Sequence, residues 1–230
     1  SPREGLIIQK VSKGTANSLY EPAMNNAECQ KAMKNGMNIT HSLKGNALLI
    51  GEMGIGNSSA AAMLLSRLTD NDIGSCTGSG TGMFGDDLKT KTVILEKVLK
   101  KHKDAKEPLD ALAAFGGLEI ATLAGAVIQA ASERRVIVVD GFIASSAVLV
   151  ASKIEPAVLD YCIFSHRSDE QGHSLMLRGM GADPLLDLKL RLGEGSGAAL
   201  AWPLLMSACA IIREMASFET AGVSRDDDKK

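Results

Sequence analysis

The sequence predicts an α/β protein with a parallel sheet covered by helices on both faces. Short runs that are apolar at every position alternate with longer segments of helical periodicity, and glycine or small polar residues follow each run. Strands buried on both faces have this continuous apolar pattern, and the helices between them supply the crossovers that parallel strands need. The chain has 230 residues, 45% apolar and 23% charged, which is enough for a sizeable core.

The predicted elements follow in chain order. The strands are 47–50, 136–139 and 161–164, of which the second is β-branched throughout. The helices are 26–35, 58–68, 92–103, 110–115, 118–131 and 145–152. In the 92–103 helix the periodicity directs five side chains toward the core: Val93, Ile94, Leu95, Val98 and Leu99. The result is a three-layer, Rossmann-like arrangement.

One long uncharged stretch, 195–212, reaches the length of about 18 residues at which a membrane span is considered. It contains Pro203 and Ser207 and directly follows the charged Arg191 and Glu194. We therefore interpret it as a buried helix of the α/β core, and we expect no membrane association.

Composition limits the organisation and the partners. We expect a single domain over 1–222, with an irregular or helical leading segment over 1–45 and a charged tail over 223–230. A net charge of −2 and eight aromatic residues argue against nucleic-acid binding. Four widely spaced cysteines form neither a disulfide framework nor a CxxC pair, so a reducing, cytoplasmic location is expected.

Glycine is in excess, with 23 residues, and it gathers where the predicted strands end. Ligands of parallel α/β sheets bind at that edge, and glycine lets backbone N–H groups approach an anion near a helix N-terminus. The first loop lacks the lysine of a Walker motif and the spacing of GxGxxG, so a tight turn is the alternative. Hydroxyl and amide groups favour phosphate: Asn57, Ser58, Ser59, Thr77, Ser79 and Thr81.

Two carboxylates, Glu52 and Glu194, occur in glycine-bounded loops. Such a group can act as a general base, or it can accept N–H bonds and hold its loop. The polar segment 165–173 contains His166 and His173 and suits a metal or a hydrogen-bonded loop, and we favour the loop. No GxSxG elbow occurs, and Cys162 lies within a strand, so nucleophilic catalysis has little support. We predict neither metal nor cofactor.

Five segments, in this order, resemble the nicotinate-nucleotide–dimethylbenzimidazole phosphoribosyltransferase (CobT-like) family. They are Gly-Glu-Met-Gly-Ile-Gly-Asn-Ser-Ser at 51–59, Gly-Ser-Gly-Thr-Gly at 78–82, Val-Asp-Gly-Phe at 139–142, the 165–173 segment, and Leu-Arg-Leu-Gly-Glu-Gly-Ser-Gly-Ala at 190–198. The resemblance spans about 14–222. It implies transfer of phosphoribose from nicotinate mononucleotide to 5,6-dimethylbenzimidazole, giving α-ribazole 5′-phosphate and nicotinate for cobalamin synthesis, by a homodimer.

The resemblance also implies roles for residues at matching positions. Glu194 would be the general base that takes a proton from the benzimidazole. The phosphate would bind at Gly54, Gly56, Asn57, Ser58, Gly80, Thr81, Gly82 and Ser168. The ribose, nicotinate and base would contact Glu52, Met53, Lys91, Asp140, Arg191 and Leu192.

The chain departs from the family pattern at two places. It begins after an N-terminal segment that supplies much of the family's benzimidazole pocket, and residues 83–85 precede an acidic pair that usually follows Gly82 at once. Two hypotheses therefore stay open. The first is an active phosphoribosyltransferase for dimethylbenzimidazole or a related base. The second is a non-catalytic or weakened relative that binds a nicotinate nucleotide or base without transfer.

Overall fold

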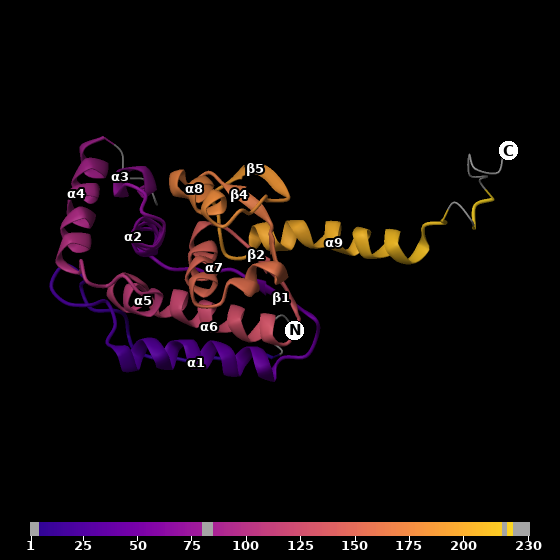
Figure 1. Ribbon diagram of the computed structural model, residues 1–230, viewed down its shortest axis with the longest axis horizontal. Coiled ribbons are helices and arrows are strands. Elements are labelled where there is room, and N and C mark those ends of the chain that lie inside the picture. Colours follow the sequence, from indigo (N-terminus) through magenta and orange to yellow (C-terminus); the bar gives the residue numbers. More distant parts are fainter. Residues whose placement is uncertain (1–4, 80–84, 218–219, 223–230) are drawn as a thin grey trace.

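A computed structural model describes residues 5–79, 85–217 and 220–222 of the chain (Figure 1). Its helices are α1 (Asn26–Ser42), α2 (Asn57–Thr69), α3 (Ile73–Cys76), α4 (Asp86–Lys101), α5 (Pro108–Phe115), α6 (Leu118–Ser132), α7 (Phe142–Ile154), α8 (Gln171–Gly179) and α9 (Ser196–Glu214), with a 3₁₀ helix, η1, at Pro156–Tyr161. Its strands are β1 (Ala47–Ile50), β2 (Val136–Val139), β3 (Cys162–Phe164), β4 (His166–Ser168) and β5 (Leu186–Leu190).

The three predicted strands form one parallel sheet in the order β1-β2-β3. Ala47 pairs with Val136, and Ile137 pairs with Cys162. Side chains of β2 alternate between two helical layers, because successive residues of a strand point to opposite faces. Ile137 and Val139 pack with α6 and α7, whereas Val138 packs with α9. The predicted parallel sheet with helices on both faces is confirmed.

A second parallel pair, β4 and β5, was not predicted from the sequence. These strands are short and partly polar: β4 is His-Arg-Ser, and β5 alternates apolar and charged residues as Leu-Asp-Leu-Lys-Leu. Neither has the continuous apolar run by which the other strands were found. The pair extends the carboxyl edge of the sheet beyond β3 and so forms part of the wall of the site.

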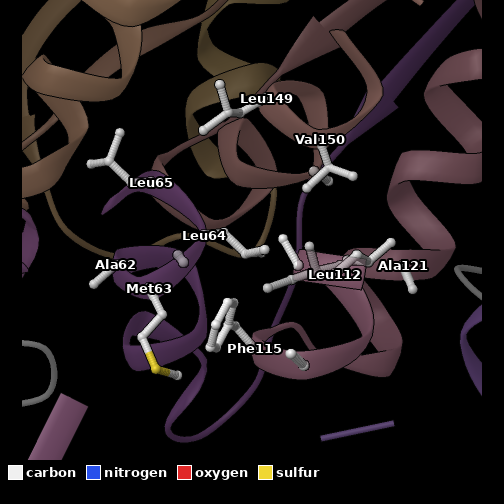
Figure 2. Packing of buried hydrophobic residues seen from close by; sticks show 14 of the residues in the cluster. Ala62, Met63, Leu64, Leu65, Leu112, Phe115, Ala121, Leu149 and Val150 are labelled. Carbon is white, nitrogen blue, oxygen red and sulfur yellow. The ribbon is translucent and has the colours of Figure 1, made fainter. Parts of the chain in front are cut away.

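Most buried side chains gather around α2, α5, α6 and α7. Figure 2 shows Leu64 of α2, Leu112 and Phe115 of α5, and Leu149 and Val150 of α7 meeting in this core. Each is nearly inaccessible to solvent. The predicted helices are confirmed, but their ends differ: α1 continues to Ser42, α4 begins at Asp86 and ends at Lys101, and α7 begins at Phe142. The short helices α3 and α8 were not predicted. Within the leading segment, α1 packs along α6 (Figure 1).

Two expectations about helix faces were wrong. Val93 and Ile94 of α4 are exposed, because α4 lies at the edge of the molecule (Figure 1). Leu95 and Val98 are buried in the core, and Leu99 is partly buried against it, as predicted. The second case is α9, which was expected to be buried. Only its first turns, at Gly197, Ala198 and Ala201, are buried, and the rest extends away from the body (Figure 1).

The exposed part of α9 is strongly apolar, and Ile212 is 84% exposed. In the described part of the chain, α9 is the one helix long and apolar enough to cross a membrane by length and composition. Composition could not show what covers this helix, because a buried core helix and an interface helix have the same apolar pattern.

Candidate active site

A cavity of about 300 Å³ lies at the carboxyl edge of the sheet. The segments that follow β1, β2 and β5 enclose it, together with β4 and the start of α2. Ligand sites of parallel α/β proteins occur at this edge. Its lining includes Glu52, Gly54, Ile55, Gly56, Asn57, Ser58, Ser59, Ser79, Lys91, Asp140, Gly141, Phe142, Ile143, Ala144, His166, Ser168, Glu170, Leu190, Arg191, Leu192 and Gly193.

The N-terminus of α2 forms one wall. Gly56 precedes the helix in the left-handed conformation, with φ 86°, and offers no side chain to cap the first turn. Lys91 of α4 reaches the same wall, and its Nζ lies 3.3 Å from Ser58 Oγ and 3.2 Å from the carbonyl oxygen of Gly78. A helix N-terminus beside an ammonium group favours a bound anion.

Burial affects the charge of Lys91. It lowers the pKa of this amine below its ordinary value, while the nearby Glu170 carboxylate acts in the opposite direction. An anion bound beside Lys91 would favour the charged form in the same way as Glu170 does.

Glu52 lies in the loop that joins β1 to α2. Asn57 donates a short hydrogen bond to Glu52 through its side-chain amide. Burial raises the pKa of Glu52, the Asn57 bond opposes that rise, and the neighbouring carboxylates of Glu119, Asp140 and Glu194 add to it. Glu52 is therefore a carboxyl group with an increased tendency to hold a proton.

Asp140 follows β2 and is almost fully buried. Its carboxylate accepts N–H bonds from the first turn of α9: Gly195 at 3.0 Å, Gly197 at 2.7 Å and Ala198 at 3.2 Å. Burial alone would raise the pKa of Asp140, but His166 and these N–H groups bring it below its ordinary value. Asp140 thus remains ionised and joins the sheet edge to the N-terminus of α9.

Glu194 lies in the loop between β5 and α9, next to the cavity-lining Gly193. Its side chain is exposed, its φ is 61°, and its N–H donates to the carbonyl oxygen of Glu52 at 3.1 Å. The loops carrying Glu52 and Glu194 touch, since a Cβ on Gly51 would overlap the backbone of Gly195. The structure therefore brings the two predicted carboxylate loops side by side.

The 165–173 segment, expected as a hydrogen-bonded loop, is instead β4 followed by the first residues of α8. His173 Nδ1 accepts the Ser168 N–H at 2.9 Å, and Nε2 lies 3.0 Å from Ser145 Oγ. Burial, helped by the nearby His166, lowers the pKa of His173 to about 3, so this ring is neutral at physiological pH. Among the described residues, no three His, Cys, Asp or Glu side chains are grouped so that they could hold a metal.

Most predicted site residues line this cavity, whereas the predicted base, Glu194, is not among its lining residues and lies beside it, next to Gly193. The lining contains Gly54, Gly56, Asn57, Ser58 and Ser168 of the predicted phosphate site, and Glu52, Lys91, Asp140, Arg191 and Leu192 of the predicted sugar and base site. Arg191 also donates to Ser79 Oγ at 3.2 Å. The predicted Gly80, Thr81 and Gly82 lie outside the described residues.

Two residues predicted to form apolar contacts with the base, Leu192 and Met53, are largely exposed to solvent. Leu192 lines the cavity but is 70% exposed, and Met53 is 74% exposed and lines a neighbouring cavity of about 430 Å³, which Glu52 also lines. Sequence reasoning omitted Gly141, Phe142 and His166 from the site. Their position directly after strands was the signal that could have found them.

A family model described as phosphoribosyltransferase matches residues 2–223. The chain belongs to this phosphoribosyltransferase family. Among curated relatives, it is 61% identical over 225 residues to a nicotinate-nucleotide–dimethylbenzimidazole phosphoribosyltransferase of Variovorax paradoxus, covering 98% of this chain and 64% of the relative. It is 52% identical to the protein of the same name from Ralstonia nicotianae, covering 96% and 63%.

Solved structures support the family membership. The chain matches the crystal structure of CobT from Thermus thermophilus with a TM-score of 0.91 and 38% identity, over 96% of this chain and 67% of that one. The chain therefore has the fold of these phosphoribosyltransferases, but it spans less than two thirds of the curated relatives' length.

Proposed function

We propose that this chain forms the transfer site of an enzyme that moves phosphoribose from nicotinate mononucleotide to 5,6-dimethylbenzimidazole or a related base. The products are α-ribazole 5′-phosphate, a precursor of the cobalamin lower ligand, and nicotinate. One observation carries this proposal: a single cavity joins the N-terminus of α2, the Lys91 amine and two touching carboxylate loops. The relatives' names supply the substrates.

The phosphate binds at the start of α2. Backbone N–H groups of Gly54 to Ser58 and the Lys91 amine supply donors and positive charge for a dianion. Ser168 contributes a hydroxyl from the opposite wall. The family resemblance also assigns Gly80, Thr81 and Gly82, which lie outside the described residues, to phosphate binding. Asp140, Arg191 and Glu52 line the part of the cavity assigned to ribose and nicotinate.

The reaction forms one C–N bond and breaks another at the anomeric carbon. One nitrogen of the base attacks this carbon, and nicotinate leaves with the electrons of its C–N bond, which neutralises its pyridinium ring. Glu194 takes the proton from the second nitrogen of the base, so that the base does not become a full cation as the new C–N bond forms. The exposed carboxylate of Glu194 then returns the proton to water.

Finer features belong to the same proposal. The chain acts as one domain over 1–222, in the cytoplasm and as a homodimer, without nucleic-acid or membrane partners. Near-neutral net charge, free thiols at Cys29, Cys76, Cys162 and Cys209, and the apolar exposed face of α9 support these assignments. We assign the exposed face of α9 to contact with the second subunit.

Nicotinate release from nicotinate mononucleotide and dimethylbenzimidazole, followed by chromatography, tests the function. Glu194→Gln keeps the size of the side chain and removes the base, so we expect the rate to fall about 100-fold or more while nucleotide affinity stays unchanged. Lys97→Met, an exposed change on the outer face of α4, serves as control. A fully active Glu194→Gln enzyme would contradict the role of Glu194.

The second candidate is a relative that binds the nucleotide without transfer. The exposure of Met53 and Leu192, which would wall the flat base, favours it. Calorimetry with nicotinate mononucleotide alone separates the two. Heat of binding without nicotinate release supports the binding protein, whereas no binding counts against both.

A further inference from the structure

Two buried histidines, His166 and His173, lie side by side, with ring centroids 6.3 Å apart. His173 has a partner for each ring nitrogen, as described above. His166 is only 1% exposed and lines the cavity, yet within the described residues neither of its ring nitrogens makes a hydrogen bond. Leaving buried ring nitrogens without a hydrogen bond costs free energy, so a histidine in this state in a ligand cavity indicates a function.

The imidazole of His166 is directed at Asp140. Its Nε2 lies 3.4 Å from Asp140 Oδ1, which is ion-pair distance but outside hydrogen-bond geometry. The same Oδ1 accepts the N–H bonds of Gly197 and Ala198. His166 and the first turn of α9 therefore hold one carboxylate oxygen from two sides.

The packing leaves little freedom at this junction. A Cβ on Gly197 would overlap the His166 ring and come within 2.7 Å of Asp140 Oδ1. The ring, the carboxylate and the backbone of α9 are thus in direct contact. A shift of His166 moves Asp140 or α9, since interiors of this density do not absorb displacements.

Glu194 stands immediately before this turn of α9. Its loop is held at two points: its own N–H on the carbonyl oxygen of Glu52, and the Gly195 N–H on Asp140 Oδ2. The second point depends on the place of the Asp140 carboxylate. The chain of contacts from His166 through Asp140 to the loop ends at the proposed general base.

We propose that His166 is a positioning residue: by pairing with Asp140 it fixes the first turn of α9 and thereby the place of Glu194 at the cavity. The proposal rests on the proposed function in so far as Glu194 is the base. His166 itself touches no reacting atom in this scheme. We expect its effect to fall more on the turnover rate than on nucleotide affinity, because the proposed main phosphate donors, Lys91 and the first turn of α2, lie on other elements.

Two substitutions of His166 distinguish a role in positioning Asp140 from a role in filling space. His166→Gln keeps an N–H donor near the place of Nε2, whereas His166→Asn keeps polarity but its shorter amide does not reach Asp140. We expect His166→Asn to lower kcat for nicotinate release about 10-fold or more with KM for nicotinate mononucleotide within about twofold, since a misplaced catalytic group costs up to about 100-fold. His166→Gln should restore most of kcat.

Amide hydrogen exchange provides a readout that does not need turnover. In His166→Asn the amides of Gly195, Gly197 and Ala198 should exchange about 10-fold faster or more, and in His166→Gln they should stay protected. Ile120→Val, a mild change in the buried face of α6, is the control for general destabilisation. It should leave both kcat and these three amides unchanged.

The outcomes are distinguishable from failure of the proposed function. An inactive wild-type chain counts against the function, while the amide exchange still decides the link between His166 and α9. Protection of the three amides in His166→Asn equal to that of the wild type overturns the proposal. So does an active wild type in which His166→Asn leaves kcat unchanged, or in which His166→Gln is as slow as His166→Asn.

Discussion

The N-termini of α2 and α9 are built alike and used differently. Each helix follows a strand, each starts at a glycine in the left-handed conformation, and each glycine lies beyond a glutamate loop. In α9 the first N–H groups are bound by Asp140, a carboxylate of the protein itself. In α2 no side chain of the described residues caps the first turn, and Lys91 stands beside it.

The difference teaches how one local motif serves two purposes. A helix N-terminus needs an anion or another acceptor for its free N–H groups. Where the protein supplies the anion, the helix terminus is held in place, and in α9 this fixes the position of Glu194. Where the first turn opens on a cavity with a lysine, it suits an anion brought by a ligand. The following changes test this division, beginning with the largest expected effect.

Gly197→Ala tests the N-terminus of α9, where Asp140 already binds the free N–H groups. Its Cβ would overlap His166 and Asp140, so we expect a loss of about 3 kcal/mol in the free energy of unfolding, measured by urea denaturation. Gly56→Ala is the matched change at α2, where the space is open and only the positive φ opposes a side chain. It should cost about 1 kcal/mol. Equal losses at the two positions would refute the difference in packing.

Asp140→Asn removes the negative charge that caps the N-terminus of α9 and changes the size of the side chain little. We expect a loss of about 2 kcal/mol in unfolding free energy, because charge-assisted bonds to three N–H groups are weakened and an amide NH₂ faces N–H donors. Asp187→Asn, at an exposed ion pair with Arg167, is the control and should leave the urea midpoint almost unchanged. A similar response of both variants would contradict the capping role.

Lys91→Met tests the N-terminus of α2, which no side chain of the described residues caps. Removing the ammonium beside Ser58 should weaken binding of nicotinate mononucleotide about 10-fold, as expected for a charge-assisted bond of about 1.4 kcal/mol. Calorimetry with nicotinate riboside, which lacks the phosphate, should show no such loss. If both ligands are weakened equally, Lys91 does not read the phosphate.

Glu52→Gln has the smallest expected effect and concerns pH. The pKa of Glu52 is raised in the folded state, chiefly by burial, so folding favours its protonated form. Its contribution to stability is therefore complete below the unfolded value of about 4.3 and is lost as the pH rises through the higher folded value. The wild type should lose stability relative to Glu52→Gln over this interval. A constant difference between pH 4 and pH 7 would contradict the shift.

How far the sequence alone reached depended on whether a feature is local. The strands around Ile50, Val138 and Phe164 were found because burial on both faces leaves a continuous apolar run. The strand pair β4 and β5 was missed because it is short and partly polar. Exposure of α9 could not be foreseen, since an apolar helix does not reveal what lies against it.

The site was predicted unevenly for the same reason. Placing Glu52 and Lys91 at one cavity required only the strand-end rule and the family resemblance. The bonds from Asp140 to Gly195 and Gly197 join segments that are far apart in the chain. No periodic pattern in the sequence predicts such a contact. His166 was noticed in its polar segment, but its contact with Asp140, and the absence of a hydrogen bond to its ring among the described residues, are visible only in three dimensions.

The order of pairing in the main sheet bears on how the protein acquires its fold. Ala47 of β1 pairs with Val136 of β2, across the whole of α2 to α6, and β3 then adds to β2 from the other side. During synthesis α1 and β1 therefore both emerge long before their partners, α6 and β2. Non-local pairing of this kind slows folding, because a long loop must close before the contact forms. The cavity, which needs β1, β2 and β5 in place, is a late product of that sequence of events.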